Sequence, residues 1–132
     1  MTAGNLASLR QTFASDEWPT FEGLTRGEQT STVILEVPGS LYWFRGHFPE
    51  QAVLPGVVQT HWAALIGQHL YPVSGAFSHI DNLKFHQVIL PGAQVSLILT
   101  PRQAKHALAF AYHHHDKCCS EGKLVFAGSL NG

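Results

Sequence analysis

The sequence has little charge and almost no cysteine. Only 13% of its 132 residues are charged, whereas about 25% is usual in soluble domains. The formal net charge is −1, so no basic surface of the kind that binds nucleic acid is expected. The scarcity of charge predicts that a partner, such as a second copy of the chain, covers part of the apolar surface.

Long apolar runs and targeting segments are also lacking. No run approaches the ~18 residues of a membrane span, and the stretch MTAGNLASLRQTF does not resemble a secretory signal. The two cysteines, Cys118 and Cys119, are adjacent, which suits neither a disulfide framework nor a zinc knuckle. These absences predict a cytoplasmic protein. Since no glycine-rich phosphate loop is present, no nucleotide cofactor is expected.

The length predicts one domain over residues 1–132, with an N-terminal segment of helix and loop over residues 1–30. Within that segment, residues 5–13 have helical spacing, and residues 15–30 are rich in breakers and polar side chains, which predicts a loop. The β-branched run 31–37 predicts a strand, and residues 44–54 a second loop.

A longer helix is expected next. Pro55 suits a first helical position, because its missing N–H would have no partner there. The apolar run that follows ends before Pro72. Because apolar residues cover most of its circumference, the helix is expected to be largely buried.

Four strand-like runs follow the helix, over residues 77–88, 93–102, 107–116 and 123–130, with turns at 90–94 and 115–123. This order predicts an α+β hot-dog fold, in which a curved antiparallel sheet wraps one long central helix. The open edge of such a sheet can pair with a second copy, so a dimer is predicted.

Two motifs lie close together before and at the start of the helix. Residues 46–49 read Gly-His-Phe-Pro and residues 53–57 read Val-Leu-Pro-Gly-Val. At this spacing they resemble the β-hydroxyacyl-acyl-carrier-protein dehydratases, the hot-dog enzymes of bacterial fatty-acid synthesis. The stretch LKFHQVILPGAQVSL resembles the strand-turn-strand segment of that family, and LPGVVQTHW resembles its ApeI-like branch, which is associated with aryl polyene lipids.

The resemblance covers residues 31–128 and implies an activity and a partner. The implied reaction converts a 3-hydroxyacyl thioester to the trans-2-enoyl thioester. The implied partner is an acyl carrier protein that bears the substrate on its phosphopantetheine arm. No metal or other cofactor is implied.

The resemblance also implies catalytic residues. It places the catalytic histidine at His47 and the amide that holds the thioester carbonyl at Gly56. A neutral imidazole, with a pKa near about 6.5, suits a general base, and N–H groups of a first helical turn suit a developing oxyanion. The family's carboxylate is replaced by His61, which we expect either to orient a water or to relay the proton of the departing hydroxyl. In the family, the two groups of one site come from different subunits.

Burial and like charge predict that the two imidazoles are not both charged and that they titrate as a coupled pair. Residues that flank them are expected to contact the substrate: Phe48, Pro55, Val57, Gln59 and Trp62. For Gln59 the alternative is a contact with a neighbouring loop, and for Trp62 it is core packing. Arg45 and Arg102 are candidates for the phosphate of the carrier arm.

The run His113–His115 suggests a metal, but alternate strand residues face opposite sides, so only His113 and His115 share a face. Two ligands make a poor zinc site. We therefore expect a solvated strand end and no metal. His79 and His86 are assigned no role.

Two other functions stay open. One is a hot-dog thioesterase that uses Glu50, the carboxylate nearest the motif. The other is a non-catalytic acyl-binding subunit, which the presence of His61 in place of a carboxylate favours. Such a subunit would pair with a different chain, so a hetero-oligomer is the alternative to the homodimer. Acyl chain length, and the choice between carrier protein and coenzyme A, do not follow from the sequence.

Overall fold

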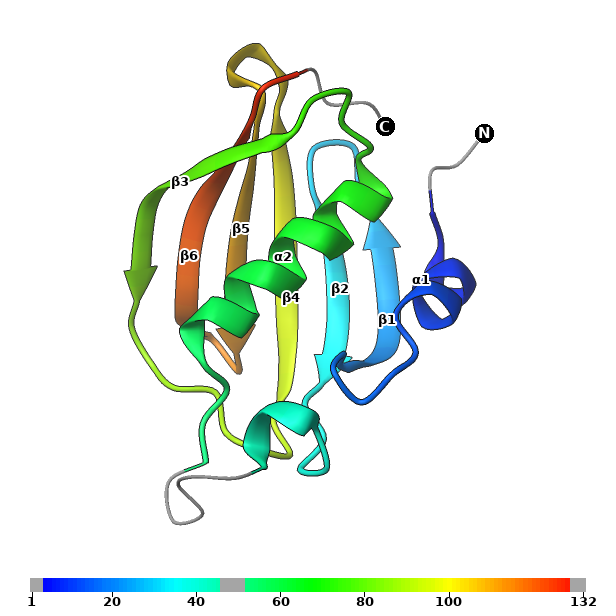
Figure 1. The fold of residues 1–132 in the computed structure, drawn as a ribbon, viewed down its shortest axis with the longest axis vertical. Coiled ribbons are helices and arrows are strands. Elements are labelled where there is room, and N and C mark those ends of the chain that lie inside the picture. Colours follow the sequence, from blue (N-terminus) through cyan, green and yellow to red (C-terminus); the bar gives the residue numbers. More distant parts are fainter. Residues whose placement is uncertain (1–3, 46–51, 129–132) are drawn as a thin grey trace.

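The computed structural model describes residues 4–45 and 52–128. Ten elements occur in this part of the chain (Figure 1). In chain order they are α1 (Leu6–Thr12), β1 (Thr20–Arg26), β2 (Ser31–Glu36), the 3-10 helix η1 (Tyr42–Phe44), α2 (Gly56–Leu70), β3 (Phe77–Phe85), β4 (Gln94–Arg102), the 3-10 helix η2 (Gln103–Lys105), β5 (Ala107–His114) and β6 (Lys117–Phe126).

The strands form one six-stranded sheet in the order β1-β2-β4-β5-β6-β3. Every neighbouring pair is antiparallel. Helix α2 lies diagonally across one face of this curved sheet, and the short α1 lies beside β1 (Figure 1). The predicted hot-dog architecture is therefore confirmed.

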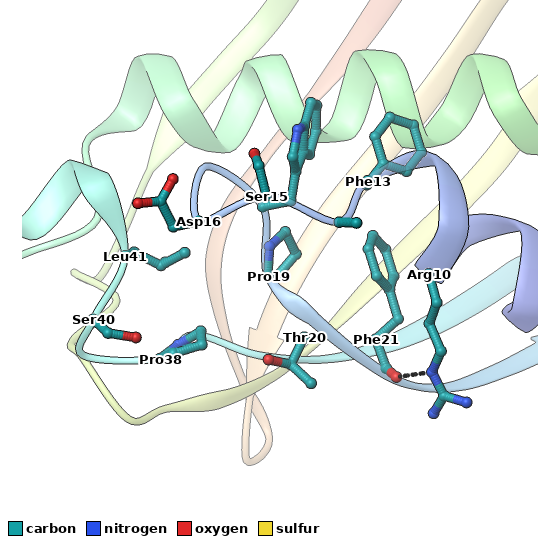
Figure 2. A pocket seen from close by; sticks show the side chains of 12 residues that line it. Arg10, Phe13, Ser15, Asp16, Pro19, Thr20, Phe21, Pro38, Ser40 and Leu41 are labelled. Atoms are coloured by element: carbon teal, nitrogen blue, oxygen red, sulfur yellow. Dashed lines mark hydrogen bonds between the residues drawn. The ribbon is translucent and has the colours of Figure 1, made fainter.

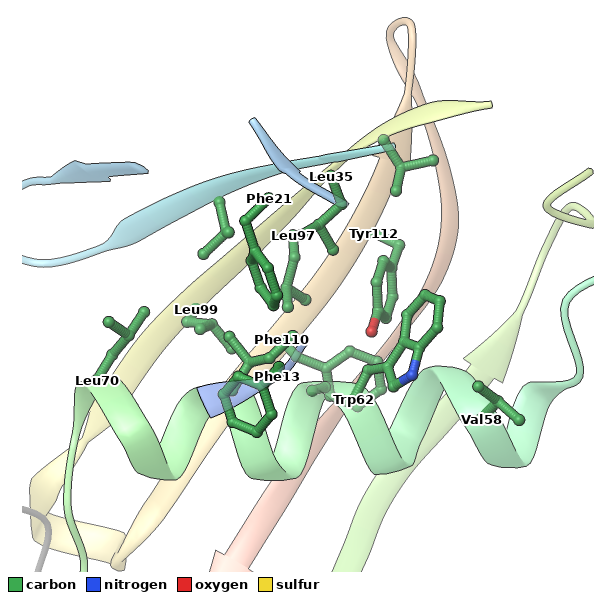
Figure 3. Close-up of a cluster of buried hydrophobic side chains, with 14 of the residues drawn as sticks. Phe13, Phe21, Leu35, Val58, Trp62, Leu70, Leu97, Leu99, Phe110 and Tyr112 are labelled. Carbon is green, nitrogen blue, oxygen red and sulfur yellow. The ribbon is translucent and has the colours of Figure 1, made fainter. Parts of the chain in front are cut away.

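The core fills the space between α2 and the sheet. Side chains of β2 alternate between buried and half-buried along the whole strand, as expected for a strand with one face on a core. Figure 3 shows Trp62 and Leu70 on the helix pointing toward Leu97, Leu99 and other side chains of the sheet. Full burial of one such aliphatic side chain contributes about 1.5–3 kcal/mol.

The expectation of a loop over residues 15–30 is wrong for residues 20–26, which form β1. Its polar residues and Gly23 suit an edge strand, because only one of its sides pairs and most of its side chains stay exposed. Phe21 is the exception, at 2% exposure. The hydrogen-bonding edge of β2 therefore decides the state of a segment whose composition favours a loop.

The turn predicted over residues 115–123 is also too long. Strand β6 already begins at Lys117, and the reversal is made by His115 and Asp116, with His115 at a φ of 56°. The turn at 90–94 is confirmed. Gly92 has a φ of 86° and the Ala93 N–H donates to the Leu90 carbonyl at 3.2 Å, as in a type II turn.

Helix α2 was expected to be largely buried. In the structure one face of the helix is buried against the sheet, and the neighbouring face is exposed at its start. Val58, Trp62, Ile66 and Leu70 are at most 3% exposed. On the neighbouring face Val57 is 75% exposed and His61 is exposed. The core of a single chain therefore leaves Val57 uncovered.

Strand β3 is the second edge of the sheet, and it pairs only with β6. Large apolar side chains on and just beyond it are exposed, namely Phe77, Leu83, Phe85, Val88 and Leu90. Exposed edges with apolar side chains are what a second chain can cover.

Candidate functional site at the start of helix α2

The first turn of α2 leaves backbone N–H groups open. The sequence predicted Pro55 as the first helical residue. In the structure Pro55 is the N-cap and Gly56 is the first helical residue, so the helix begins one residue later than predicted. The Val58 and Gln59 N–H groups both donate to the Pro55 carbonyl at 3.1 Å. Within the described residues, the amides of Gly56 and Val57 have no acceptor. They form the positive end of the helix dipole.

Phe85 lies against this helix end. A Cβ added to Gly56 would stand 2.6 Å from Phe85 Cζ, so any larger residue at position 56 forces the ring to move. Phe85 itself is 52% exposed. The sequence did not reveal this close approach of a ring from β3, because the two residues are far apart in the chain.

Gln59 supports the loop that leads into the helix. Its side chain is 3% exposed. Its Nε2 donates to the Leu54 carbonyl at 3.0 Å, and its Oε1 accepts from Ser120 Oγ at 2.7 Å. Its backbone carbonyl accepts from Tyr112 Oη at 2.7 Å. These contacts match the alternative interpretation, in which Gln59 binds a neighbouring loop; contact with substrate stays a prediction.

Trp62 occupies the core position that the alternative interpretation gave it. It is fully buried, and its Nε1 donates to the Glu17 carbonyl at 2.8 Å. The same carbonyl accepts from Trp43 Nε1 at 2.8 Å. Two indoles thus hold the segment before β1 in place. Contact of Trp62 with substrate stays a prediction.

His61 lies on the exposed side of α2 and stacks on Trp18. Their ring centroids are 5.4 Å apart with an interplanar angle of 29°. Trp18 follows directly after Glu17, whose carbonyl is held by the two indoles. The environment of His61 is therefore an open surface with one aromatic wall, where the sequence predicted an apolar interior. Trp18 was missed, because it falls in the segment expected to be loop.

The predicted roles of His47, Phe48 and Glu50 lie outside the described residues. Gly56 and His61 are both placed. Five residues of an α-helix correspond to about 7.5 Å along the axis and about 140° around it. Within one chain, the open amide of Gly56 points out of the N-terminal end of α2 along its axis, whereas the imidazole of His61 projects from the side of the helix about one and a half turns further on.

Figure 2 shows a pocket of about 450 Å³ between the segment after α1, the start of β1 and the loop after β2. Arg10, Asp16 and Trp18 contribute to its lining. None of the predicted site residues lines it. Trp18 alone connects it to the candidate site, since this ring also stacks on His61.

Arg45 and Arg102 do not come together. Arg45 pairs with Asp16 at 2.7 Å and follows η1, beyond the end of β2 that pairs with the start of β4. Arg102 is the last residue of β4. They therefore lie toward opposite ends of the sheet, and one phosphate cannot meet both.

The other histidines that the sequence singled out lie on or next to strands β3 and β5. Strand β5 ends at His114, so His115 does not continue the face of His113; the rings of His114 and His115 are 4.2 Å apart. His79 and His86 pair with Asp81 and Glu121 at 3.2 and 2.9 Å.

Among the residues that the structure describes, no helix has the length and apolar character needed to cross a membrane. The prediction of a cytoplasmic location is not tested by this finding.

The sequence and the fold both match known proteins. A curated 3-hydroxyacyl-[acyl-carrier-protein] dehydratase FabZ from Cupriavidus taiwanensis is 34% identical over 89 residues, which are 61% of this chain. The match spans 57% of that relative's length. The solved dehydratase heterocomplex ApeI:P from Xenorhabdus doucetiae contains a chain that superposes with a TM-score of 0.75 and 32% identity. The superposition covers 87% of this chain and 99% of that one.

The fold is shared beyond dehydratases. A thioesterase from Haemophilus influenzae superposes on 92% of this chain and 87% of its own, with a TM-score of 0.63 and 17% identity. That likeness shows the fold alone. The family model of the ApeI-like proteins, described as ApeI dehydratase, matches residues 24–123. Its span takes in β2 to β5 and the whole of α2, with the open amides at its start, so the chain belongs to the ApeI-like dehydratase family.

Proposed function

We propose that this protein dehydrates 3-hydroxyacyl thioesters, carried by an acyl carrier protein, to trans-2-enoyl thioesters. The observation that carries the proposal is the start of α2. Two open amides follow Pro55 there, a few residues after the Gly-His-Phe-Pro motif that ends at Pro49. The FabZ relative and the ApeI complex are both named dehydratases, which supports the same reaction.

In the proposed mechanism, the thioester carbonyl accepts a hydrogen bond from the Gly56 N–H. An imidazole nitrogen of His47 takes the proton from C2, and negative charge builds on the carbonyl oxygen. The C3–O bond then breaks as the C2–C3 double bond forms, and the hydroxyl leaves as water with a proton from the His61 imidazolium. One oxyanion donor of this kind contributes about 3 kcal/mol to the transition state.

His61 would act on a substrate held by a second chain. In the resembled family, the catalytic histidine and the carboxylate of one site come from different subunits, so we pair His61 of one chain with His47 of the other. A dimer through β3 would cover the exposed Leu83 and Phe85 and bring a second α2 close to the first. We therefore propose a site assembled across this interface, with Val57, Pro55 and Phe48 as its apolar lining.

The second chain is proposed to be another copy of this one. The ApeI:P structure is named a heterocomplex, so a different dehydratase-like chain is the alternative. Size-exclusion chromatography with light scattering tests this. We expect a dimer that Leu83→Lys dissociates and that Tyr42→Lys, an exposed apolar residue of η1, leaves intact. A Leu83→Lys protein that remains dimeric would contradict the β3 interface.

A non-catalytic acyl-binding subunit is the second candidate, because His61 stands where the resembled family has a carboxylate. A solved thioesterase shares the fold of this chain, which is the support for the thioesterase alternative. Glu50, the carboxylate that this alternative would use, lies outside the described residues. A cytoplasmic location and an acyl-carrier partner remain part of the proposal.

The deciding experiment incubates the protein with 3-hydroxyacyl thioesters of several chain lengths, on carrier protein and on coenzyme A. Conjugated enoyl absorbance reports dehydration and free thiol reports hydrolysis. We expect enoyl product that His47→Ala abolishes and His114→Ala, a histidine at the end of β5, leaves unchanged. Thiol release without enoyl product would establish a thioesterase. Neither product, with acyl binding retained, would establish the non-catalytic subunit.

His61→Glu separates the two interpretations of position 61. If the imidazole supplies the leaving proton, the variant loses turnover while its affinity for substrate is retained. A gain of activity would instead show a degraded site, in which the family's carboxylate is the better group.

A further inference from the structure

Three metal-ligating side chains meet at the β3–β6 edge of the sheet. His86 directly follows β3, and Cys118 and Glu121 belong to β6. One ligand atom from each lies within 4.8 Å of the other two. His86 Nε2 and Glu121 Oε2 are 2.9 Å apart. The His86 backbone N–H donates to the Cys119 carbonyl at 2.8 Å, so the backbone that carries the imidazole is itself fixed to β6.

A bulge in β6 brings Cys118 and Glu121 to one face. In the register with β5, Tyr112 pairs with Ser120 and His113 pairs with Cys118, so Cys119 is the extra residue. Both Cys119 and Ser120 are fully buried. Without the bulge, residues three apart would face opposite sides of the sheet. With it, Cys118 and Glu121 share the more open side, where both are half-buried.

A thiolate, an imidazole and a carboxylate are the ligand types that zinc takes in proteins. Oxygen-preferring cations such as Mg²⁺ and Ca²⁺ do not select thiolate and imidazole. From this donor set and its geometry, we propose that His86, Cys118 and Glu121 bind one zinc ion per chain. The fourth position stays open to water.

The surroundings add one possible ligand and one competing charge. His113 is the direct cross-strand partner of Cys118, so its Cβ lies about 4.5–5.5 Å from that of the cysteine. Lys84 stands opposite Glu121 in the β3–β6 register. A positive charge at this neighbouring position disfavours a bound cation, so Lys84→Gln is expected to tighten zinc binding.

The site would stabilise the end of β3. This strand pairs with β6 alone, and its side chains are almost all exposed. Phe85, whose ring lies against Gly56, is the residue before His86. Zinc would therefore hold together the β3–β6 edge and, through it, the ring at the start of α2.

The test uses the reduced full-length protein. Zinc affinity is measured by competition with a chromophoric chelator, and Co²⁺ is added separately to detect ligation by sulfur. We expect one zinc per chain, and Co²⁺ spectra with a thiolate charge-transfer band that Cys118→Ser removes. His86→Ala and Glu121→Gln are expected to weaken zinc binding by more than about tenfold, the scale on which metal sites respond to lost partners.

Two matched controls are available in the neighbouring residues. Cys119→Ala removes the adjacent thiol, which faces the core, and His114→Ala removes a histidine of the neighbouring strand. Both are expected to keep the affinity and the spectrum of the parent. The proposal is overturned if the parent binds no zinc. It is equally overturned if Co²⁺ spectra lack the thiolate band, or if the His114→Ala control loses binding while the three ligand variants retain it.

Discussion

Replacing Gln59 by leucine tests the support beneath the start of α2. Leucine keeps the approximate volume but removes both side-chain hydrogen bonds. The Leu54 carbonyl and the Ser120 hydroxyl would then be left without partners, in residues that are 2% and 0% exposed. A buried polar group that loses its partner costs about 1–3 kcal/mol.

The two groups together predict a loss of about 2–6 kcal/mol in the free energy of unfolding. This is a large part of the about 5–15 kcal/mol that a domain of this kind possesses. Adding Ser120→Ala to Gln59→Leu removes one of the two unpaired groups, so the double variant is expected to recover about 1–3 kcal/mol. Ser120→Ala alone leaves Gln59 Oε1 unpaired and is destabilising.

Urea denaturation at one fixed protein concentration measures these differences, with the slope of the transition checked for constancy. Gln68→Leu is the control, because Gln68 is half-buried on the same helix and its side chain has no hydrogen bond among the described residues. It is expected to change stability by less than about 0.5 kcal/mol. The reasoning is refuted if Gln59→Leu behaves like the control, or if the double variant is less stable than Gln59→Leu.

Three further outcomes follow from single positions. Gly67→Ala places a methyl group against the Leu108 side chain in the core. We expect a net loss of stability, because overpacking costs about 1–3 kcal/mol and the gain in helix propensity is about 1 kcal/mol. A raised midpoint of urea denaturation would contradict this packing. Burial lowers the pKa of His69, whose Nε2 contacts Ser8 Oγ at 2.8 Å. At pH values below the ordinary histidine pKa of 6.5, the unfolded chain takes up a proton that the native imidazole resists. Acidification from neutral pH is therefore expected to lower the free energy of unfolding of the parent more than that of His69→Gln. Equal losses of stability in the two proteins would refute this. Burial, and then the Glu121 carboxylate, raise the pKa of the Cys118 thiol. Without metal, its alkylation by iodoacetamide is therefore expected to be slower at neutral pH than that of a free cysteine, and to become faster as pH rises. An alkylation rate equal to that of free cysteine would contradict the raised pKa.

Much of the fold follows from local pattern. The alternation of buried and half-buried side chains in β2 and the start of α2 next to Pro55 are determined by residues that are neighbours in the sequence. The turn at Gly92 is too, because a positive φ favours glycine wherever it occurs. The same is true of the Gly-His-Phe-Pro and Leu-Pro-Gly motifs, which sufficed to indicate the family.

The rest depended on contacts between distant segments. The state of β1 is decided by the free edge of β2, and the bulge at Cys119 is decided by the register with β5. Trp18 meets His61, and Phe85 meets Gly56, only once the sheet has curved around α2. A sequence pattern reports which residues share a strand or a helix face. Which faces then meet, and which side chains converge at an edge, is set by long-range pairing and packing, so the surroundings of His61 and the cluster of His86, Cys118 and Glu121 became visible only in the tertiary structure.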